Sequence, residues 1–128
     1  MERKEIYVLN EQDKKIVQLF NRLGMPKHLA KTLLYISQVG GECYSEDIQW
    51  GTDLLQPDVS IAMQELCKRG WAEKSIQKKK KMGKGRPRDI YKTTKDLRLS
   101  DIVKAFDQEK REEFENARKK ISELQKLL

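Results

Sequence analysis

Cysteine and histidine are scarce in this sequence, which limits the sites it can form. The 128 residues include two cysteines, Cys43 and Cys67, and one histidine, His28. Two distant cysteines are too few for a disulfide framework or a zinc site, so we expect no metal and no other cofactor. Cys67 falls on the apolar side of a helical segment, which favours a structural role, with redox sensing as the alternative. We expect His28 to be a solvated helix residue.

Long apolar runs are absent as well. No stretch reaches the roughly 18 residues that span a bilayer, so we expect no contact with a membrane. The opening segment "MERKEIYVLNEQDKK" contains no apolar core of a secretory signal, and a reducing cytoplasm is the simplest location. Hydrophobic residues make up 38%, which is low for a globular chain but above the disordered range. We therefore expect a small core, and the length of 128 residues predicts one domain with room for one appended element.

Catalytic motifs are missing too. The sequence shows no nucleophile paired with a base and no metal-spaced cluster. The segment "GKGRP" has glycines but lacks the Lys-Ser/Thr pair that completes a P-loop. We therefore expect that the protein is not an enzyme.

Positive charge is plentiful and unevenly distributed. The net charge is +7, and the segment from Lys68 to Lys95 contains twelve basic residues but only two acidic ones, Glu73 and Asp89. The rest of the chain is slightly acidic, a distribution typical of proteins that bind a polyanion. A membrane-binding basic helix would interleave large apolar residues, but Met82 is the only apolar side chain in 78–88. Nucleic acid is thus the favoured partner; a solvated charge run or a localisation signal remains the alternative.

The first half of the chain predicts two helices. In 12–23, "QDKKIVQLFNRL", apolar residues recur at helical spacing, and Gly24 ends the run. In 25–41, "MPKHLAKTLLYISQVGG", Pro26 suits the first helical position and a glycine pair stops the helix. Residues 42–44, "ECY", are long enough for a short strand.

Two further helices with a short turn predict a helix-turn-helix. Ser45 resembles an N-cap and starts a helix that ends near Leu54, because acidic residues follow it in the first turn. The next helix begins near Pro57, places its apolar residues on one face and ends at Gly70. The second of these helices is the candidate recognition helix.

Two strands with a basic loop between them predict a wing. "WAEKSIQKKK" (71–80) and "DIYKTT" (89–94) both read as strands, and "KKMGKGRPR" (80–88) links them with two glycines and a proline. We therefore expect the basic run at the tip of a β-hairpin. The "GRP" tripeptide is also similar to an AT-hook, so Arg86 and Arg88 can enter a narrow minor groove.

The last segment, 96–128, predicts one long helix without glycine or proline. Acidic and basic residues are equally frequent in it, so it is not a second DNA-binding surface. A narrow stripe with nearly heptad spacing predicts packing against a second copy of the chain; packing back on its own domain is the alternative. The stripe comprises Val103, Phe106, Lys110, Phe114, Ala117, Ile121, Leu124 and Leu128.

The order of these elements resembles the winged helix-turn-helix transcriptional regulators of the MarR type, closest to their archaeal TrmB-like and ArsR-like relatives. The resemblance rests on "QPDVSIAMQELCKRGWAEK" and "GKGRPRDIYKTT". It covers about residues 12–96, and the long helix only by its position. It implies a mostly α fold with a small β-hairpin (α+β): an N-terminal arm (1–11), a DNA-binding domain (12–95) and a dimerisation helix (96–128).

The recognition helix departs from the resemblance in one respect. Ile61 stands where many family members have a basic residue, so electrostatic affinity would come mainly from the wing. Ser60 and Gln64 can hydrogen-bond base edges, and Ile61 can touch a thymine methyl group unless it is buried. The residues expected at the DNA are Ser45, Pro57, Asp58, Ser60, Ile61, Gln64, Lys68, Arg69, Lys78, Lys79, Lys80, Lys81, Lys84, Arg86 and Arg88.

These features predict a homodimeric regulator of transcription that reads double-stranded DNA through the helix at 57–69. The alternative is a winged-helix interaction module that binds RNA or a protein of the transcription machinery. Neither the operator, nor the direction of regulation, nor a small-molecule effector follows from the sequence.

Overall fold

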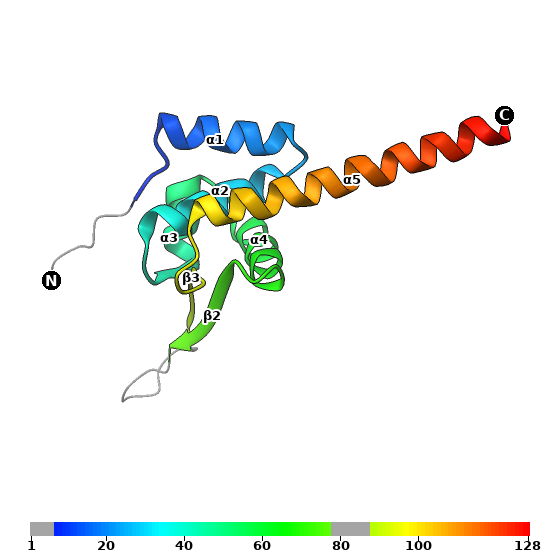
Figure 1. The fold of residues 1–128 in the computed structure, drawn as a ribbon. Coiled ribbons are helices and arrows are strands. Elements are labelled where there is room, and N and C mark those ends of the chain that lie inside the picture. The colour runs from blue at the N-terminus through cyan, green and yellow to red at the C-terminus, as the bar shows by residue number, and fades with distance from the viewer. Residues whose placement is uncertain (1–6, 78–87) are drawn as a thin grey trace, which may run out of the picture. The chain divides into compact units, whose positions relative to one another are not determined.

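The computed structural model describes residues 7–77 and 88–128, and within them a winged helix with a long C-terminal helix (Figure 1). A three-stranded antiparallel sheet has the order β1-β3-β2. The chain divides into two compact units, Met1–Lys95 and Asp96–Leu128. The elements are α1 (Glu11–Arg22), α2 (Lys27–Val39), β1 (Cys43–Tyr44), α3 (Ser45–Thr52), α4 (Gln56–Lys68), β2 (Ala72–Gln77), β3 (Arg88–Thr93) and α5 (Leu99–Leu127).

The predicted α+β winged-helix fold is confirmed, with small changes at the ends of elements. Pro26 is the N-cap of α2 and not its first helical residue, and Gly40 ends that helix in the left-handed region at φ 68°. Ser45 is the first residue of α3 and not its cap, which is Tyr44. Strand β2 begins one residue later than predicted, and β3 keeps the predicted length but is shifted by one residue. The predicted end of β2 and the hairpin tip, residues 78–87, lie outside the described residues.

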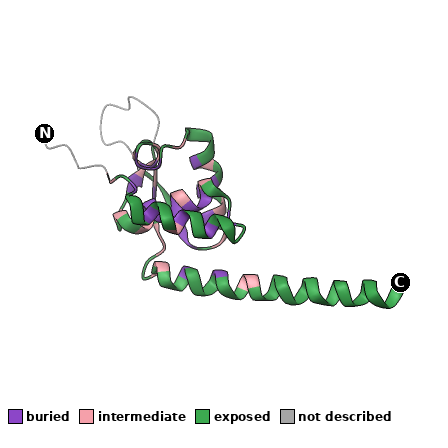
Figure 2. Cartoon of the chain, turned by 90° about the horizontal axis from the view of Figure 1, so that it is seen from above, coloured by how far each residue is buried: buried purple, intermediate pink, exposed green. Residues whose placement is uncertain are grey.

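Helix α2 is the centre of the winged unit. It packs against α1, α3, α4 and β3. Because neighbours surround it, most of its residues are buried, and Leu33, Leu34 and Ile36 are fully so. Figure 2 shows this concentration of buried residues in the winged unit. Burying side chains of this size is the main favourable term in folding.

One close approach fixes α3 against α2. A Cβ atom at Gly51 would overlap the ring of Tyr35 and the backbone carbonyl of Tyr7. The arm before α1 runs across the same place, where the Leu9 N–H donates to the Gly51 carbonyl at 3.1 Å. Glycine is therefore required at 51 for steric reasons, and the arm covers the contact.

The sheet joins the helix-turn-helix to the wing. Strand β3 lies between β1 and β2, pairing Tyr91 with Cys43 on one side and with Lys74 on the other. The Cys43 thiol donates to the Tyr91 carbonyl at 3.3 Å. The base of the hairpin is thereby tied to the segment that leads directly into α3.

Helix α5 is 29 residues long and mostly exposed. Its buried residues are Ile102 and Phe106, and every residue from Arg111 to the end is exposed. Within the described part of the chain, no helix is both long and apolar enough to cross a membrane.

A buried carboxylate, Asp13, connects the arm, α1 and α2. Its Oδ2 accepts from the Asn10 N–H at 2.9 Å and from the Tyr7 hydroxyl, and its Oδ1 accepts from Gln38 Nε2 at 3.1 Å. The Asp13 N–H in turn donates to Asn10 Oδ1 at 2.9 Å, which caps α1. Burial, and then the bond to Asp13, raise the pKa of Tyr7 to about 12. A single side chain of α1 thus satisfies two donors from the arm and one from α2.

We predict that Asp13→Ala lowers the free energy of unfolding by about 1.5–3 kcal/mol, the range for hydrogen bonds to a charged group. Urea titration followed by circular dichroism measures this value. The matched control is Glu11→Ala, which removes an exposed carboxylate from the same helix and should change stability by less than about 0.5 kcal/mol. Equal effects of the two variants would contradict the structural role of Asp13.

Candidate nucleic-acid interface

Helix α4 presents a polar face because its apolar residues fill the core. Val59, Ala62, Met63 and Leu66 are buried. On the other side Asp58, Ile61, Gln64 and Lys68 are exposed, and Ser60 is half-buried at the edge. The exposed fraction of Ile61 is 55%, so the alternative that Ile61 is buried is wrong.

The start of the helix-turn-helix supplies two further candidates. Pro57 is the second residue of α4 and is exposed. Ser45 is half-buried at the start of α3, where its Oγ accepts from Gln49 Nε2 at 3.2 Å. Both lie at helix N-termini, where backbone N–H groups favour a phosphate.

The two basic residues that close α4 differ. Lys68 is exposed. Arg69 forms an ion pair with Glu65 at 3.5 Å, and its guanidinium lies 5.0 Å from the centre of the Trp71 ring. Lys68 is therefore accessible to a phosphate, whereas Arg69 is partly occupied within the protein.

Arg88 is held at the base of the hairpin. Its Nη2 is 2.5 Å from Glu46 Oε2, and its guanidinium stacks 3.9 Å from the centre of the Tyr44 ring. The pKa of Glu46 is lowered, first by its own backbone hydrogen bond and then by Arg88, against an opposing effect of burial. The contact joins β3 to the start of α3, so Arg88 orients the wing strand and reaches DNA only if it leaves Glu46.

The other predicted wing residues cannot be placed. Lys78, Lys79, Lys80, Lys81, Lys84 and Arg86 lie outside the described residues.

The helix-turn-helix itself is acidic. Glu46, Asp47, Asp53, Asp58 and Glu65 precede Lys68 and Arg69 in the segment 45–69. This segment alone would repel a phosphate backbone, so any attraction must come from basic residues elsewhere in the chain.

A groove of about 260 Å³ separates α4 from the sheet, and no sequence pattern indicated it. It is lined by Ser60, Met63, Gln64, Cys67, Lys74 and Tyr91. Lys74 lies 3.9 Å from Asp89, and burial raises the pKa of Tyr91. Two of the predicted base-reading residues, Ser60 and Gln64, thus share a concave edge with Lys74. The strand register brings Lys74 beside Tyr91, a pairing that only the sheet reveals.

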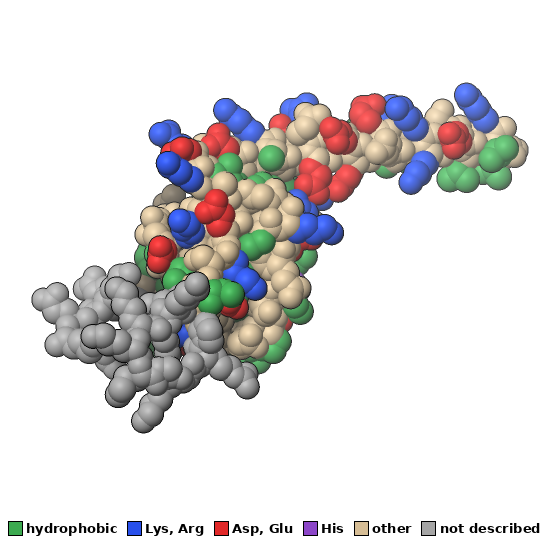
Figure 3. Space-filling view, turned by 90° about the horizontal axis from the view of Figure 1, so that it is seen from below, with side chains coloured by type: hydrophobic (Ala, Val, Ile, Leu, Met, Phe, Trp, Pro, Cys, Tyr) green, Lys and Arg blue, Asp and Glu red, His purple; other side chains and the backbone are tan. Residues whose placement is uncertain are grey.

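The stripe on α5 is exposed for most of its length. Val103 is 47% exposed, Phe114 61%, Ile121 54% and Leu124 57%, and Leu128 and Ala117 are also exposed. Phe106 is only 4% exposed and Lys110 is half-buried, so neither offers a large surface to another chain. Figure 3 shows acidic and basic side chains interspersed along this helix, with hydrophobic atoms near its end.

No family model matches the sequence, and neither does any curated protein sequence. Solved structures do match in fold. TrmBL2, described as an archaeal chromatin protein with a novel mode of DNA binding, is 18% identical with a TM-score of 0.61 over 90% of this chain. This chain spans 42% of the TrmBL2 chain.

A possible transcriptional regulator from Methanosarcina mazei Go1 is 14% identical with a TM-score of 0.57, and the match covers 86% of each chain. At these identities the likeness establishes the winged-helix fold and nothing finer.

The reactivity of the Cys67 thiol tests the alternative that this residue senses redox conditions. Burial raises the pKa of its thiol, so less thiolate is present at neutral pH than in a free cysteine. We predict that Cys67, in a Cys43→Ser background, reacts with iodoacetamide at pH 7.5 more slowly than glutathione does. Mass spectrometry over time measures both rates. A faster reaction of Cys67 would indicate an activated thiol and would favour redox sensing.

Proposed function

We propose that the protein is a transcriptional regulator that binds double-stranded DNA as a homodimer, with α4 in the major groove. One observation carries the proposal: the core-forming residues of α4 leave Ile61 and Gln64 exposed on one face, with Ser60 half-buried at its edge. The fold shared with TrmBL2 and with the Methanosarcina mazei protein supports it, and so does the resemblance to MarR-type and TrmB-like regulators.

The face of α4 suits direct readout of bases. The Gln64 amide both donates and accepts, as pairing with the edge of adenine requires. Ile61 offers an apolar surface for a thymine methyl group, and the Ser60 hydroxyl suits either type of base. Asp58 is the one exposed carboxylate of this face and would accept from a cytosine amino group. The side chains of α4 therefore suit sequence-specific contacts with bases better than electrostatic attraction to the phosphate backbone.

Electrostatic affinity for the phosphate backbone would come from the wing and the end of α4. Residues 78–88 carry seven basic side chains and no acidic one. Each phosphate that they neutralise releases counterions, which adds affinity without sequence preference. This attraction would offset the repulsion from the carboxylates of α3 and α4.

Dimerisation would use the exposed stripe of α5 from Phe114 to Leu128. A narrow apolar stripe on an isolated helix is seldom left in water, and a two-fold interface needs only one self-complementary patch. Two copies would place their α4 helices on half-sites of a pseudo-palindrome.

A protein partner is the second candidate. The five carboxylates of 45–69 make the helix-turn-helix surface less suited to DNA than a basic one. This observation favours an interaction module that binds a basic surface on another protein.

The first functional prediction concerns the wing. Lys84→Ala with Arg86→Ala should weaken binding to every duplex alike and reduce the slope of log affinity against log salt by about 0.9 for each phosphate that is no longer neutralised. Arg88 is kept in this variant because it holds Glu46. Fluorescence anisotropy at several salt concentrations measures the slope. Lys104→Ala with Arg118→Ala removes the same charge from exposed positions of α5 and serves as control. An unchanged slope in the wing variant would show that the hairpin does not bind phosphates.

The second prediction separates sequence-specific affinity from non-specific electrostatic affinity. Gln64→Ala should cost about 1–3 kcal/mol on the preferred site and little on random duplex, because only the preferred site offers the matching base edge. The measurement is the ratio of the two dissociation constants. Gln12→Ala, which shortens the same type of side chain at an exposed position of α1, is the control. An equal loss on both duplexes would favour the interaction module.

The third prediction concerns the α5 stripe. Phe114→Asp, Ile121→Asp and Leu124→Asp together put unpaired charges into the proposed seam, each costing several kcal/mol on burial. Sedimentation should show a monomer with weaker operator binding, because one half-site loses the gain from linking two.

The control for this variant places three aspartates on the polar side of α5, at Gln108, Asn116 and Lys119. It should remain dimeric. A stripe variant that is still dimeric at micromolar concentration would show that the interface lies elsewhere.

A further inference from the structure

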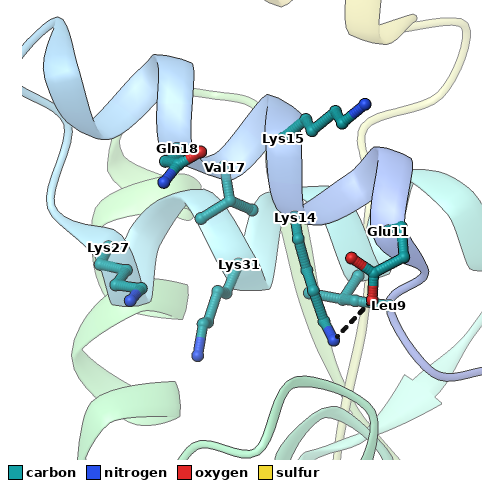
Figure 4. A pocket seen from close by; sticks show the side chains of 8 residues that line it. All are labelled: Leu9, Glu11, Lys14, Lys15, Val17, Gln18, Lys27 and Lys31. Carbon is teal, nitrogen blue, oxygen red and sulfur yellow. Dashed lines mark hydrogen bonds and ion pairs between the residues drawn. The ribbon is translucent and has the colours of Figure 1, made fainter.

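Helices α1 and α2 enclose a lysine-lined groove, which we call the lysine groove (Figure 4). Its volume is about 480 Å³. It is lined by Leu9, Glu11, Lys14, Lys15, Val17, Gln18, Lys27 and Lys31. In Figure 4 the side chains of Lys14, Lys27 and Lys31 extend to the same side, and Lys15 points away from them.

The positive charge of the groove is little compensated nearby. Among these described lining residues, Glu11 is the only acid, and it lies 3.4 Å from Lys14 in an exposed pair. Asp13, the other acid of α1, is buried and accepts hydrogen bonds from three neutral donors. Even with both carboxylates counted, the four lysines of the lining leave a net positive charge.

The start of α2 adds to this potential. Lys27 is the first residue of α2, whose N-cap Pro26 makes no side-chain cap hydrogen bond and whose first turn has no acidic residue. The positive end of the helix dipole and the ammonium groups of Lys27 and Lys31 therefore act in the same direction. Such an arrangement is unfavourable unless an anion offsets it.

The lining favours a polyanion over a small ligand. The apolar residues Val17 and Leu9 are 3% and 7% exposed, so they offer little apolar surface to a small organic ligand. The lysines Lys14, Lys15 and Lys27 are exposed at the rim, where single ion pairs are weak. Several weak contacts add up only when their anions belong to one chain, as in a nucleic-acid backbone.

The groove is separate from the proposed reading surface. None of its lining residues comes from α3, α4, β2 or β3. Helix α1 packs on α2, and Figure 1 shows it at the end of the winged unit away from the hairpin strands. The groove is therefore a surface distinct from the exposed face of α4.

We propose that the lysine groove binds the phosphate backbone of a second DNA duplex, so that one protein chain bridges two duplexes. The proposal rests on the proposed function, since α4 and the wing hold the first duplex. The groove contributes no base reading, because its cations are lysines at an open rim, and it accepts any sequence.

Bridging is tested by capture of two duplexes. A biotinylated preferred-site duplex is saturated with the full chain, and retention of a fluorescent random duplex is measured at about 0.15 M salt. Lys14→Gln, Lys27→Gln and Lys31→Gln together should reduce retention at least about tenfold, since up to three phosphates are no longer neutralised. Affinity for the first duplex should stay within about twofold. The matched control neutralises three exposed lysines of α5, Lys104→Gln, Lys119→Gln and Lys120→Gln, and should bridge like the wild type.

The other outcomes overturn the proposal. Retention unchanged in the groove variant would mean that two copies of α4 bridge the duplexes. The same conclusion would follow if the three stripe aspartates on α5 abolished retention at a protein concentration that still saturates the first duplex. Equal losses in the groove variant and its control would mean a general charge effect. Binding of inorganic pyrophosphate in the groove without capture of a second duplex would assign the groove to a free anion. Affinity for the first duplex is measured in the same experiment, so a failure of the proposed function is seen separately.

Discussion

The burial of α2 is the constraint on which the winged unit depends. This helix contacts α1, α3, α4 and β3, so it must be apolar around most of its circumference. Its neighbours then need only one apolar face each, which leaves their outer faces free for polar residues. Substitutions at the fully buried Leu33 or Leu34 would disturb the core, whereas residues on the outer face of α4 can change without loss of core packing.

This arrangement gives the small winged unit a packed core and, at the same time, an exposed polar face on α4. Val59, Ala62 and Met63 anchor α4 in the core, while Ile61 and Gln64 remain outside. The contact between Arg88 and Glu46 then fixes the wing strand relative to α3. The exposed face of α4 is in this way positioned by contacts that lie outside it. Under the proposed function, the carboxylates of 45–69 would separate the reading of bases from the attraction to phosphates, which would fall to basic residues outside 45–69.

Local patterns predicted the elements well because helix periods, caps and glycine stops are encoded within a few residues. The Gly40 stop, the Pro57 start and the apolar side of α4 are of this kind. Contacts between distant residues were not predictable. Nothing local in the sequence marks Asp13 as buried, because its bonds to Tyr7 and Gln38 form only when the arm, α1 and α2 pack together. The same holds for Arg88, which a basic run marks as a DNA contact and which Glu46 holds in the structure. The lysines of α1 and α2 meet only because the two helices pack together, and Phe106 shares the spacing of the α5 stripe although it is buried.

The central claim is that α4 reads the sequence of a duplex. Selection of bound fragments from a pool of random duplexes, carried out with the wild type and with Gln64→Ala in parallel, tests it most directly. The account predicts that the wild type enriches two half-sites related by a two-fold axis. It also predicts that Gln64→Ala loses the preference at one base pair of each half-site and keeps the others. A wild-type pool without any enriched sequence would contradict the claim.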